Sequence, residues 1–276
     1  MNIIIVQVVV FAIMVVLFGI TAYKDRQKMS VKDVSVVALL CVLNVVLSKA
    51  LSIKIPPAAP ILVISLASVV SITIGILYSP KISLLAGLVI DLIGVLIAPA
   101  TGDGSMPFLG FTLTAMLACF IPSVCSRYFK DKSKKLVITA LVSTVILAII
   151  SISFIIFNND VLSLDNKTKI VLDSSHRTLI MSSIIGIFAL VIILSRVASI
   201  KLKDKVIIDI NVLTLIILLE QLICSVILTS FWINIMYGVP LVVGVGIRLI
   251  KMVISLPIFI ILTTTLVSFL KKRKIV

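Results

Sequence analysis

The run NIIIVQVVVFAIMVVLFGITA at residues 2–22 has no charged side chain and is long enough to cross a membrane as a helix. At about 1.5 Å per residue such a helix measures roughly 30 Å, the thickness of the hydrocarbon layer. A secretory signal would begin with basic residues and end at a small-residue cleavage site, and this run has neither feature. Its basic residues follow it at Lys24, Arg26 and Lys28, which predicts a retained helix with an external N-terminus.

The whole chain has the composition of an integral membrane protein. Of its 276 residues, 61% are hydrophobic and only 13% are charged. Soluble domains average roughly 45–50% apolar and about 25% charged residues. A soluble fold is therefore excluded, and the length is better counted in membrane spans of about 20 residues each.

Further apolar segments of similar length predict an all-α membrane protein with nine spans. These lie at 2–22, 31–51, 60–78, 82–99, 107–127, 136–157, 178–198, 206–232 and 247–270. Eighteen of the 25 Lys and Arg residues then fall in the loops or tail on one side of the membrane. Because basic loops stay in the cytoplasm, this predicts an external N-terminus and a cytoplasmic C-terminus. The sizeable loop 158–177 would then be external, with His176 as a solvated residue.

Motifs of known chemistry are missing from the sequence. It contains no G-x-x-x-x-G-K-S/T phosphate loop, no HExxH and no GxSxG. The four cysteines lack the spacing of a metal site or a disulfide framework and are interpreted as buried thiols; they are Cys41, Cys119, Cys125 and Cys224. We therefore expect no enzymatic activity, no cofactor and no metal, and any pumping would draw energy from a partner or from an ion gradient.

Ionisable side chains within the spans are the candidate functional residues, because each costs about 3 kcal/mol or more in lipid. Arg248 and Lys251 stand at i, i+3 near the predicted start of the last span, so they share a helix face at the outer boundary. Lys49 ends a span that runs outward, and it reaches the same depth. Three cations at one level form a candidate receptor for an anion. The alternative is that these long side chains snorkel to lipid headgroups.

Asp91 is predicted near mid-span on a helix face of otherwise small residues. The face consists of Gly87, Asp91, Gly94 and Ala98 at helical spacing. Because small residues let helices approach closely, we expect this face to be buried against protein. Asn44, in an earlier span, is a further intramembrane polar residue for which we expect a structural role.

Glu220 is also predicted near mid-span, and Gln221 beside it begins a polar stripe that ends at Trp232. This stripe is either the wall of a substrate cavity or a set of interhelical hydrogen bonds with Trp232 as an interface anchor. Intramembrane carboxyl groups also permit a second function. Asp91 and Glu220 would then couple a self-sufficient secondary transporter to an ion gradient.

Four stretches of the chain resemble the substrate-binding S components of energy-coupling factor (ECF) vitamin transporters, in particular the folate group. They are ALLCVLNVVLSKALSI at 38–53, AGLVIDLIG at 86–94 with PATGDGSMPFLGFTLTA at 99–115, EQLICSVILTSFWINIMYG at 220–238, and RLIKMVISLP at 248–257. The FLGFTLTA segment and the WINIMYG and RLIK pair are the most specific parts of the resemblance.

The resemblance implies a six-helix core that captures a small anionic vitamin-like molecule, folate or a related one, from outside. It also implies docking on a membrane scaffold subunit driven by two cytoplasmic ATPase subunits. The residues expected to bind the substrate are Lys49, Arg248, Lys251, Trp232, Gln221 and Phe111. Docking is expected at Ala38 and Val42, where S components carry an Ala-xxx-Ala seam. Folate-group members carry arginine where this chain has Ala118 and Lys49.

A six-helix core leaves three of the nine spans over. The expected organisation is an extra N-terminal helix and cytoplasmic loop at 1–30, core helices 1–4 at 31–127, an inserted helix pair with its outer loop at 128–205, and core helices 5–6 with a basic tail at 206–276. One added helix and one inserted pair leave the orientation of the core unchanged. The expected location is a bacterial plasma membrane.

Overall fold

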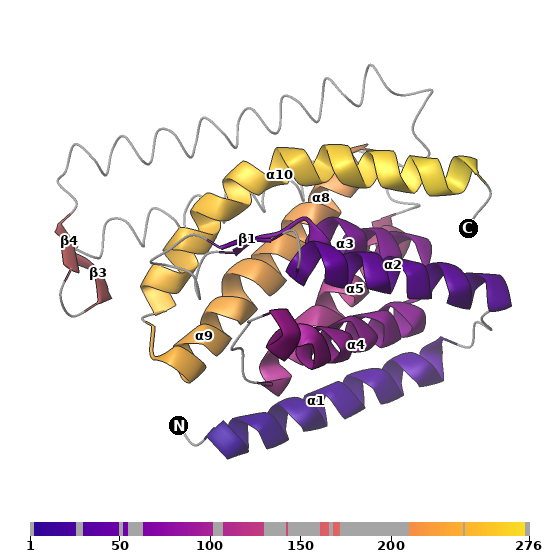
Figure 1. Cartoon of the computed structure of the whole chain (residues 1–276). Helices are drawn as coiled ribbons and strands as arrows, with labels where there is room; N and C mark the ends of the chain where they lie inside the picture. The colour runs from indigo at the N-terminus through magenta and orange to yellow at the C-terminus, as the bar shows by residue number, and fades with distance from the viewer. Residues whose placement is uncertain are drawn as a thin grey trace. The chain divides into compact units, whose positions relative to one another are not determined.

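The computed structural model describes residues 3–25, 30–49, 52–54, 63–101, 107–129, 142, 161–165, 168–171, 210–239 and 241–273. These residues are mostly helical, with four short strands (Figure 1). The chain divides into two compact units. The first comprises Met1–Ile53, Ile64–Asp131 and Ile261–Val276, and the second comprises Lys54–Val63 and Lys132–Ile260.

The first unit is a bundle of apolar helices. Its elements are α1 (Ile3–Lys24), α2 (Val31–Lys49), α3 (Ala67–Leu77), α4 (Pro80–Ile97), the 3-10 turn η1 (Ala98–Thr101), α5 (Leu109–Phe129) and the end of α10 (Leu241–Lys272). Helices α4 and α5 pack together, α3 lies against α5, and α2 lies against α3 and α4 (Figure 1). Helix α1 contacts α4 and α5. A buried cluster that runs from Val37 on α2 to Leu270 on α10 forms the core of this unit.

Local sequence fixes the start of α2. Ser30 and Asp33 form a reciprocal capping pair, because the Asp33 N–H donates to Ser30 Oγ and the Ser30 N–H donates to Asp33 Oδ2, each at 3.1 Å. This pairing satisfies two donors that the first turn of a helix leaves free. Helix α2 therefore begins where the basic loop ends, as the sequence predicts.

The close approach of α4 and α5 depends on Gly87. A Cβ atom at Gly87 would lie 2.5 Å from the Ala115 carbonyl oxygen and 2.6 Å from Met116 Cα. Gly87, Gly94 and Ala98 are all buried, so the small face predicted on this helix is packed against protein. Asp91 on the same face is half-buried.

The second unit contains one continuous helix of 28 residues, Ile210–Tyr237, and the first part of α10. The long helix consists of α8 (Ile210–Glu220), the π-helical turn η2 (Gln221–Leu228) and α9 (Thr229–Tyr237). It ends at Gly238, whose φ of 67° is readily adopted only by glycine. The Asn234 side-chain amide donates to the Val239 carbonyl at 2.8 Å and holds this turn.

The four strands are short. Strands β1 (Ile53–Lys54) and β2 (Val63–Ile64) form one two-stranded sheet. Strands β3 (Val161–Asp165) and β4 (Thr168–Val171) form an antiparallel pair within the predicted external loop 158–177. Helices remain the framework of the described chain, as predicted.

Six described helices are long and apolar enough to cross a membrane. They are Ile3–Lys24, Val31–Lys49, Pro80–Ile97, Leu109–Phe129, Ile210–Tyr237 and Ser255–Lys272. Each coincides with a predicted span, and the span predicted at 60–78 contains the shorter α3. The spans predicted at 136–157 and 178–198 lie outside the described residues, so nine spans and their orientation stay predictions.

The start of the last span differs from its prediction. The last span was predicted to begin at residue 247, but α10 already begins at Leu241. Gly244 lies in a helix because its surface packs on α9, where a Cβ atom at this position would lie 3.4 Å from Ser230 Cβ. The glycine here serves close helix packing and not a loop.

The cysteines behave largely as predicted. Cys41, Cys119 and Cys224 are buried, Cys125 is half-buried, and none of the four forms a disulfide within the described part of the chain. They serve as small packing residues in the described helices.

Candidate functional site

Arg248 lies deeper in its helix than the sequence predicted. It stands seven residues after Leu241, which is about two turns or roughly 10 Å along the axis. The side chain is only 7% exposed. Its Nη1 donates to the Ser225 carbonyl at 3.3 Å, while its Nε has no hydrogen-bond partner among the described residues. A buried guanidinium with an unused donor is costly, so this site favours an acceptor that completes it.

The π-helical turn explains why the Ser225 carbonyl meets Arg248. In an α-helix the Thr229 N–H would bond the Ser225 carbonyl, four residues earlier. In this turn the Thr229 N–H bonds the Cys224 carbonyl, and the Thr229 hydroxyl donates to the same oxygen at 2.6 Å. The shifted register leaves the Ser225 carbonyl able to accept from Arg248. Single π-helical turns occur frequently at functional sites.

The two long helices of the second unit run antiparallel along a row of polar groups. Ser230 packs on Gly244, and further along Ser225 meets Arg248. We call this row the polar seam; it consists of Glu220, Gln221, Ser225 and Ser230 on one helix and Gly244, Arg248 and Lys251 on the other. The Ser230 hydroxyl is buried and also has no partner within the described part of the chain.

The polar seam has an excess of positive charge. Glu220 is 2% exposed and accepts a 2.6 Å hydrogen bond from the Gln221 side-chain amide. Its carboxyl group attracts the Lys251 ammonium, and Lys251 in turn lies near enough to Arg248 for mutual repulsion. Glu220 offsets at most one of the two positive charges. Chemically, this arrangement suits an anion with oxygen acceptors.

Trp232 and its neighbour form the aromatic part of the second unit. Trp232 is 5% exposed, and Phe231 lies edge-on to it with ring centroids 5.0 Å apart. The sequence predicted a stripe at regular α-helical spacing from Gln221 to Trp232. The π-helical turn adds a residue to that turn, so the spacing of the stripe differs from the prediction.

A second polar group lies in the first unit. The Thr112 hydroxyl donates to Asp91 Oδ2 at 2.7 Å, which joins α5 to α4. The Cε atom of Lys49 lies 3.7 Å from the position that a Cβ atom would take at Gly94, one turn beyond Asp91. The Lys49 ammonium also attracts the Asp91 carboxylate. Lys49 therefore follows the surface of α4 toward an acid within its own unit.

The other residues of interest in the first unit have simple surroundings. Asn44 donates from its amide to the Ala67 carbonyl and to Ser71 Oγ, both at 2.8 Å, and so ties α2 to the first turns of α3. Phe111 is half-buried and packs edge-on against Phe108 with centroids 5.9 Å apart. Ala38 and Val42 are both exposed on α2.

The structure brings together only part of the predicted substrate site. Gln221, Arg248 and Lys251 meet along the polar seam, and Trp232 belongs to the same unit. Lys49 and Phe111 belong to the first unit. Sequence reasoning missed the Ser225 carbonyl and the Thr112 hydroxyl. The polar side chain of Thr112 within FLGFTLTA could have been recognised in the sequence. The Ser225 carbonyl could not, because a π-helical turn has no sequence pattern that would reveal which carbonyl it exposes.

The helices and composition define a multi-pass, mainly helical membrane protein with buried charged groups. A family model described as "ECF-type riboflavin transporter, S component" matches residues 28–199. Because this range covers more than half of the chain, the protein belongs to that family. The family consists of transport subunits and not of enzymes. The match ends before α8, so the polar seam lies beyond the matched range.

Two further comparisons complete this result. No curated protein matches the chain. A solved structure described as "Crystal structure of FolT bound with folic acid" matches with 21% sequence identity and a TM-score of 0.48, over 86% of this chain and 93% of that one.

Proposed function

We propose that this protein is the substrate-capture subunit of an ECF-type, ATP-driven importer and that it binds a small anionic vitamin-like molecule, folate or a related one, from outside. Membership in a family of S components supports the role of capture subunit. The anionic class of the substrate rests on one observation, the buried Arg248 with an unused Nε–H donor. A carboxylate or phosphate oxygen would satisfy this donor with a charge-assisted hydrogen bond.

The polar seam and Trp232 are the part of the proposed substrate site that lies within one unit. Arg248 supplies the charged fork, Lys251 a second positive charge, and Gln221 a neutral amide beside Glu220. Trp232 offers an aromatic face for a ring system. Lys49 and Phe111, in the first unit, are proposed as substrate contacts on the sequence resemblance alone.

The proposed partners are a membrane scaffold subunit and two cytoplasmic ATPase subunits. The sequence has no phosphate loop, and in this proposal the ATPase subunits supply the energy for uptake. The exposed Ala38 and Val42 on α2 are the proposed contact with the scaffold, because a small residue lets a partner helix approach closely.

The proposed topology has nine spans, an external N-terminus and a cytoplasmic C-terminus in a bacterial plasma membrane. The family match begins at residue 28, directly after the first helix, which supports treating 1–30 as an addition to the core. The same match continues to residue 199, within the proposed inserted pair at 128–205, so deletion of this pair tests whether it is an insertion. An inserted pair can be removed with ligand binding intact, whereas a core pair cannot.

The substrate is tested by isothermal titration of the purified protein with folate and with riboflavin. Folate carries carboxylates, whereas riboflavin is uncharged at neutral pH, so an anion site predicts binding of folate or a folate-like anion and little binding of riboflavin. Tight riboflavin binding that is unchanged in Arg248→Ala would overturn the anionic class while leaving the capture role in place. Uptake by cells that continues after ATP depletion and stops with an uncoupler would overturn the ATP-driven role itself.

A further inference from the structure

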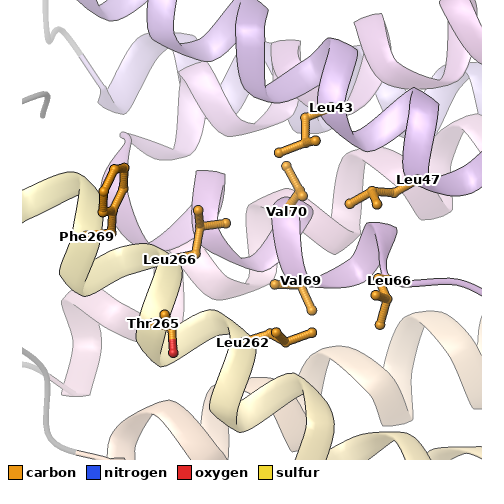
Figure 2. Close-up of a pocket in the computed structure, with 9 residues that line it drawn as sticks. All are labelled: Leu43, Leu47, Leu66, Val69, Val70, Leu262, Thr265, Leu266 and Phe269. Atoms are coloured by element: carbon orange, nitrogen blue, oxygen red, sulfur yellow. The ribbon is translucent and has the colours of Figure 1, made fainter. Parts of the chain in front are cut away.

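An open apolar groove of about 370 Å³ lies in the first unit, between α2, the start of α3 and the end of α10 (Figure 2). It is lined by Leu43, Leu47, Leu66, Val69, Val70, Leu262, Thr265, Leu266 and Phe269. Figure 2 shows these side chains converging on the space between the ribbons. The groove shares no residue with the polar seam, and all its lining residues belong to the first unit.

The lining offers hydrocarbon and almost nothing else. Eight of its nine side chains are apolar, and the one hydroxyl, on Thr265, donates to the Ile261 carbonyl of its own helix at 2.8 Å. A ligand acceptor atom would therefore find no unused donor among these side chains. The chemistry of the groove therefore selects an apolar occupant.

The end of the groove carries a cation. The guanidinium of Arg273 lies 5.8 Å from the centroid of the Phe269 ring, and Phe269 lines the groove. Leu262, Leu266 and Phe269 recur at helical spacing, and Arg273 continues their face by one more turn. Lys272 stands beside Arg273, and both side chains are exposed. An apolar track along α10 thus leads directly to positive charge.

The volume of the groove distinguishes between a hydrocarbon chain and a protein helix as its occupant. At roughly 30 Å³ for a water-sized group, its volume holds about a dozen methylene-sized groups in a row. A helix about 10 Å in diameter with a 5.4 Å pitch would fit for only about one turn. The space suits a single flexible hydrocarbon chain better than a helix from a partner protein.

We propose that this groove binds one acyl chain of an anionic phospholipid, with the headgroup phosphate at Arg273 and Lys272. Basic groups at the membrane end of a helix attract anionic headgroups, and an apolar groove next to them holds the attached chain. Lipid tails already surround the protein, so burial alone does not select this lipid. Its selectivity comes from the cations, and its fixed position comes from the groove.

The test measures lipid retention by native mass spectrometry. The purified full chain is mixed with phosphatidylglycerol or with phosphatidylcholine of the same acyl length, and bound lipid is counted at increasing collision energy. Wild type is expected to retain one phosphatidylglycerol more firmly than phosphatidylcholine. The double variant Lys272→Ala/Arg273→Ala should lose about fivefold in relative retention for each cation removed. Both side chains are exposed at a helix end, so the fold should be preserved.

Two controls separate the groove from general charge and general apolar surface. Arg127→Ala removes an exposed cation from the end of α5 and should leave retention unchanged. Leu266→Trp fills the groove and should reduce retention, whereas Leu96→Trp, at a side chain that is 78% exposed, should not. Glycerol phosphate without acyl chains should not displace the bound lipid.

Several results would overturn the proposal. If Arg127→Ala and the double variant lose the same amount of lipid retention, the effect comes from the net charge of the protein and not from Lys272 and Arg273. Equal retention of both lipids by wild type would remove the headgroup selectivity. Unchanged lipid retention in Leu266→Trp together with loss of the scaffold subunit on co-purification would assign the groove to a protein helix.

Discussion

Arg248 shows how a single buried side chain narrows the chemistry of a site. Its guanidinium has five N–H donors, yet the described residues provide one long hydrogen bond from Nη1 and nothing for Nε. An arginine that snorkels would extend to water or headgroups, and Arg248 is instead turned onto the Ser225 carbonyl. This geometry favours the interpretation of Arg248 as a ligand contact.

Arg248→Ala is expected to weaken binding of an anionic ligand by about 1.5–3 kcal/mol, the scale of one charge-assisted hydrogen bond. Arg248→Lys should recover only part of this loss, since an ammonium lacks the planar fork. Lys251→Ala should cost less than Arg248→Ala, because Glu220 already attracts part of the Lys251 charge. Isothermal titration of each purified variant measures these differences.

The matched control for this series is Arg127→Ala, which removes the same kind of charge at an exposed helix end. It should bind ligand as wild type does, and all variants should insert and elute as the wild type. If both Arg248→Ala and Lys251→Ala bind normally, the two residues are headgroup anchors and the proposed site is wrong.

At the level of the helix, the sequence was a good guide to position and a poor one to local register. The span predicted at 31–51 is observed as Val31–Lys49, and that at 107–127 as Leu109–Phe129. Apolar length and flanking charge determine these limits, and both can be read directly from the sequence. Apolar length and flanking charge do not determine which backbone carbonyl each N–H bonds. The π-helical turn Gln221–Leu228 was therefore not predicted.

The candidate substrate site was also predicted only in its local features. The i, i+3 spacing placed Arg248 and Lys251 on one face correctly, because helical periodicity is a local property. The helix start was placed too late, because the span was predicted from residue 247 and α10 begins at Leu241, whereas the depth of the two residues in the membrane stays a prediction. The contact of Arg248 with Ser225 joins residues that are 23 positions apart, so it depends on tertiary packing.

Gly87→Ala should destabilise the pairing of α4 and α5. The added methyl would have to displace the Ala115 and Met116 backbone, and overpacking of this kind typically costs about 1–3 kcal/mol. Gly19→Ala on α1 is the matched control, because no atom lies within 4 Å of its Cβ position. Thermal unfolding in detergent should show a lower midpoint for Gly87→Ala alone. Equal midpoints would mean that the two helices are less tightly packed than the structure indicates.

For the whole molecule, the predicted topology makes one side of the membrane strongly basic. A single cysteine introduced by Ser163→Cys, within β3, should react with an impermeant maleimide added outside intact cells. Ser133→Cys, in a predicted inner loop, should react only after permeabilisation. Three native thiols are buried and Cys125 is half-buried, so a variant without Cys125 gives a low background. The reverse labelling pattern would refute the external N-terminus.

The purified chain alone is expected to bind its ligand without hydrolysing ATP, because no phosphate loop is present in its sequence. Hydrolysis should appear only when the scaffold and ATPase subunits are co-purified with it. Ala38→Trp should reduce that co-purification by blocking close helix approach, whereas Leu96→Trp on α4 should not. Robust hydrolysis by the chain alone would contradict the capture role, and normal assembly of Ala38→Trp would remove α2 from the docking surface.

Helix α10 has a point of low bending stiffness. Pro257 lies inside this helix of 32 residues, and its ring nitrogen cannot donate to the carbonyl four residues earlier. The missing bond falls between Arg248 and Ile261 along the helix. A helix that lacks one backbone hydrogen bond bends at that turn with a lower energy cost than elsewhere. Replacement of Pro257 by alanine would restore the bond and make this turn of α10 as stiff as its neighbours.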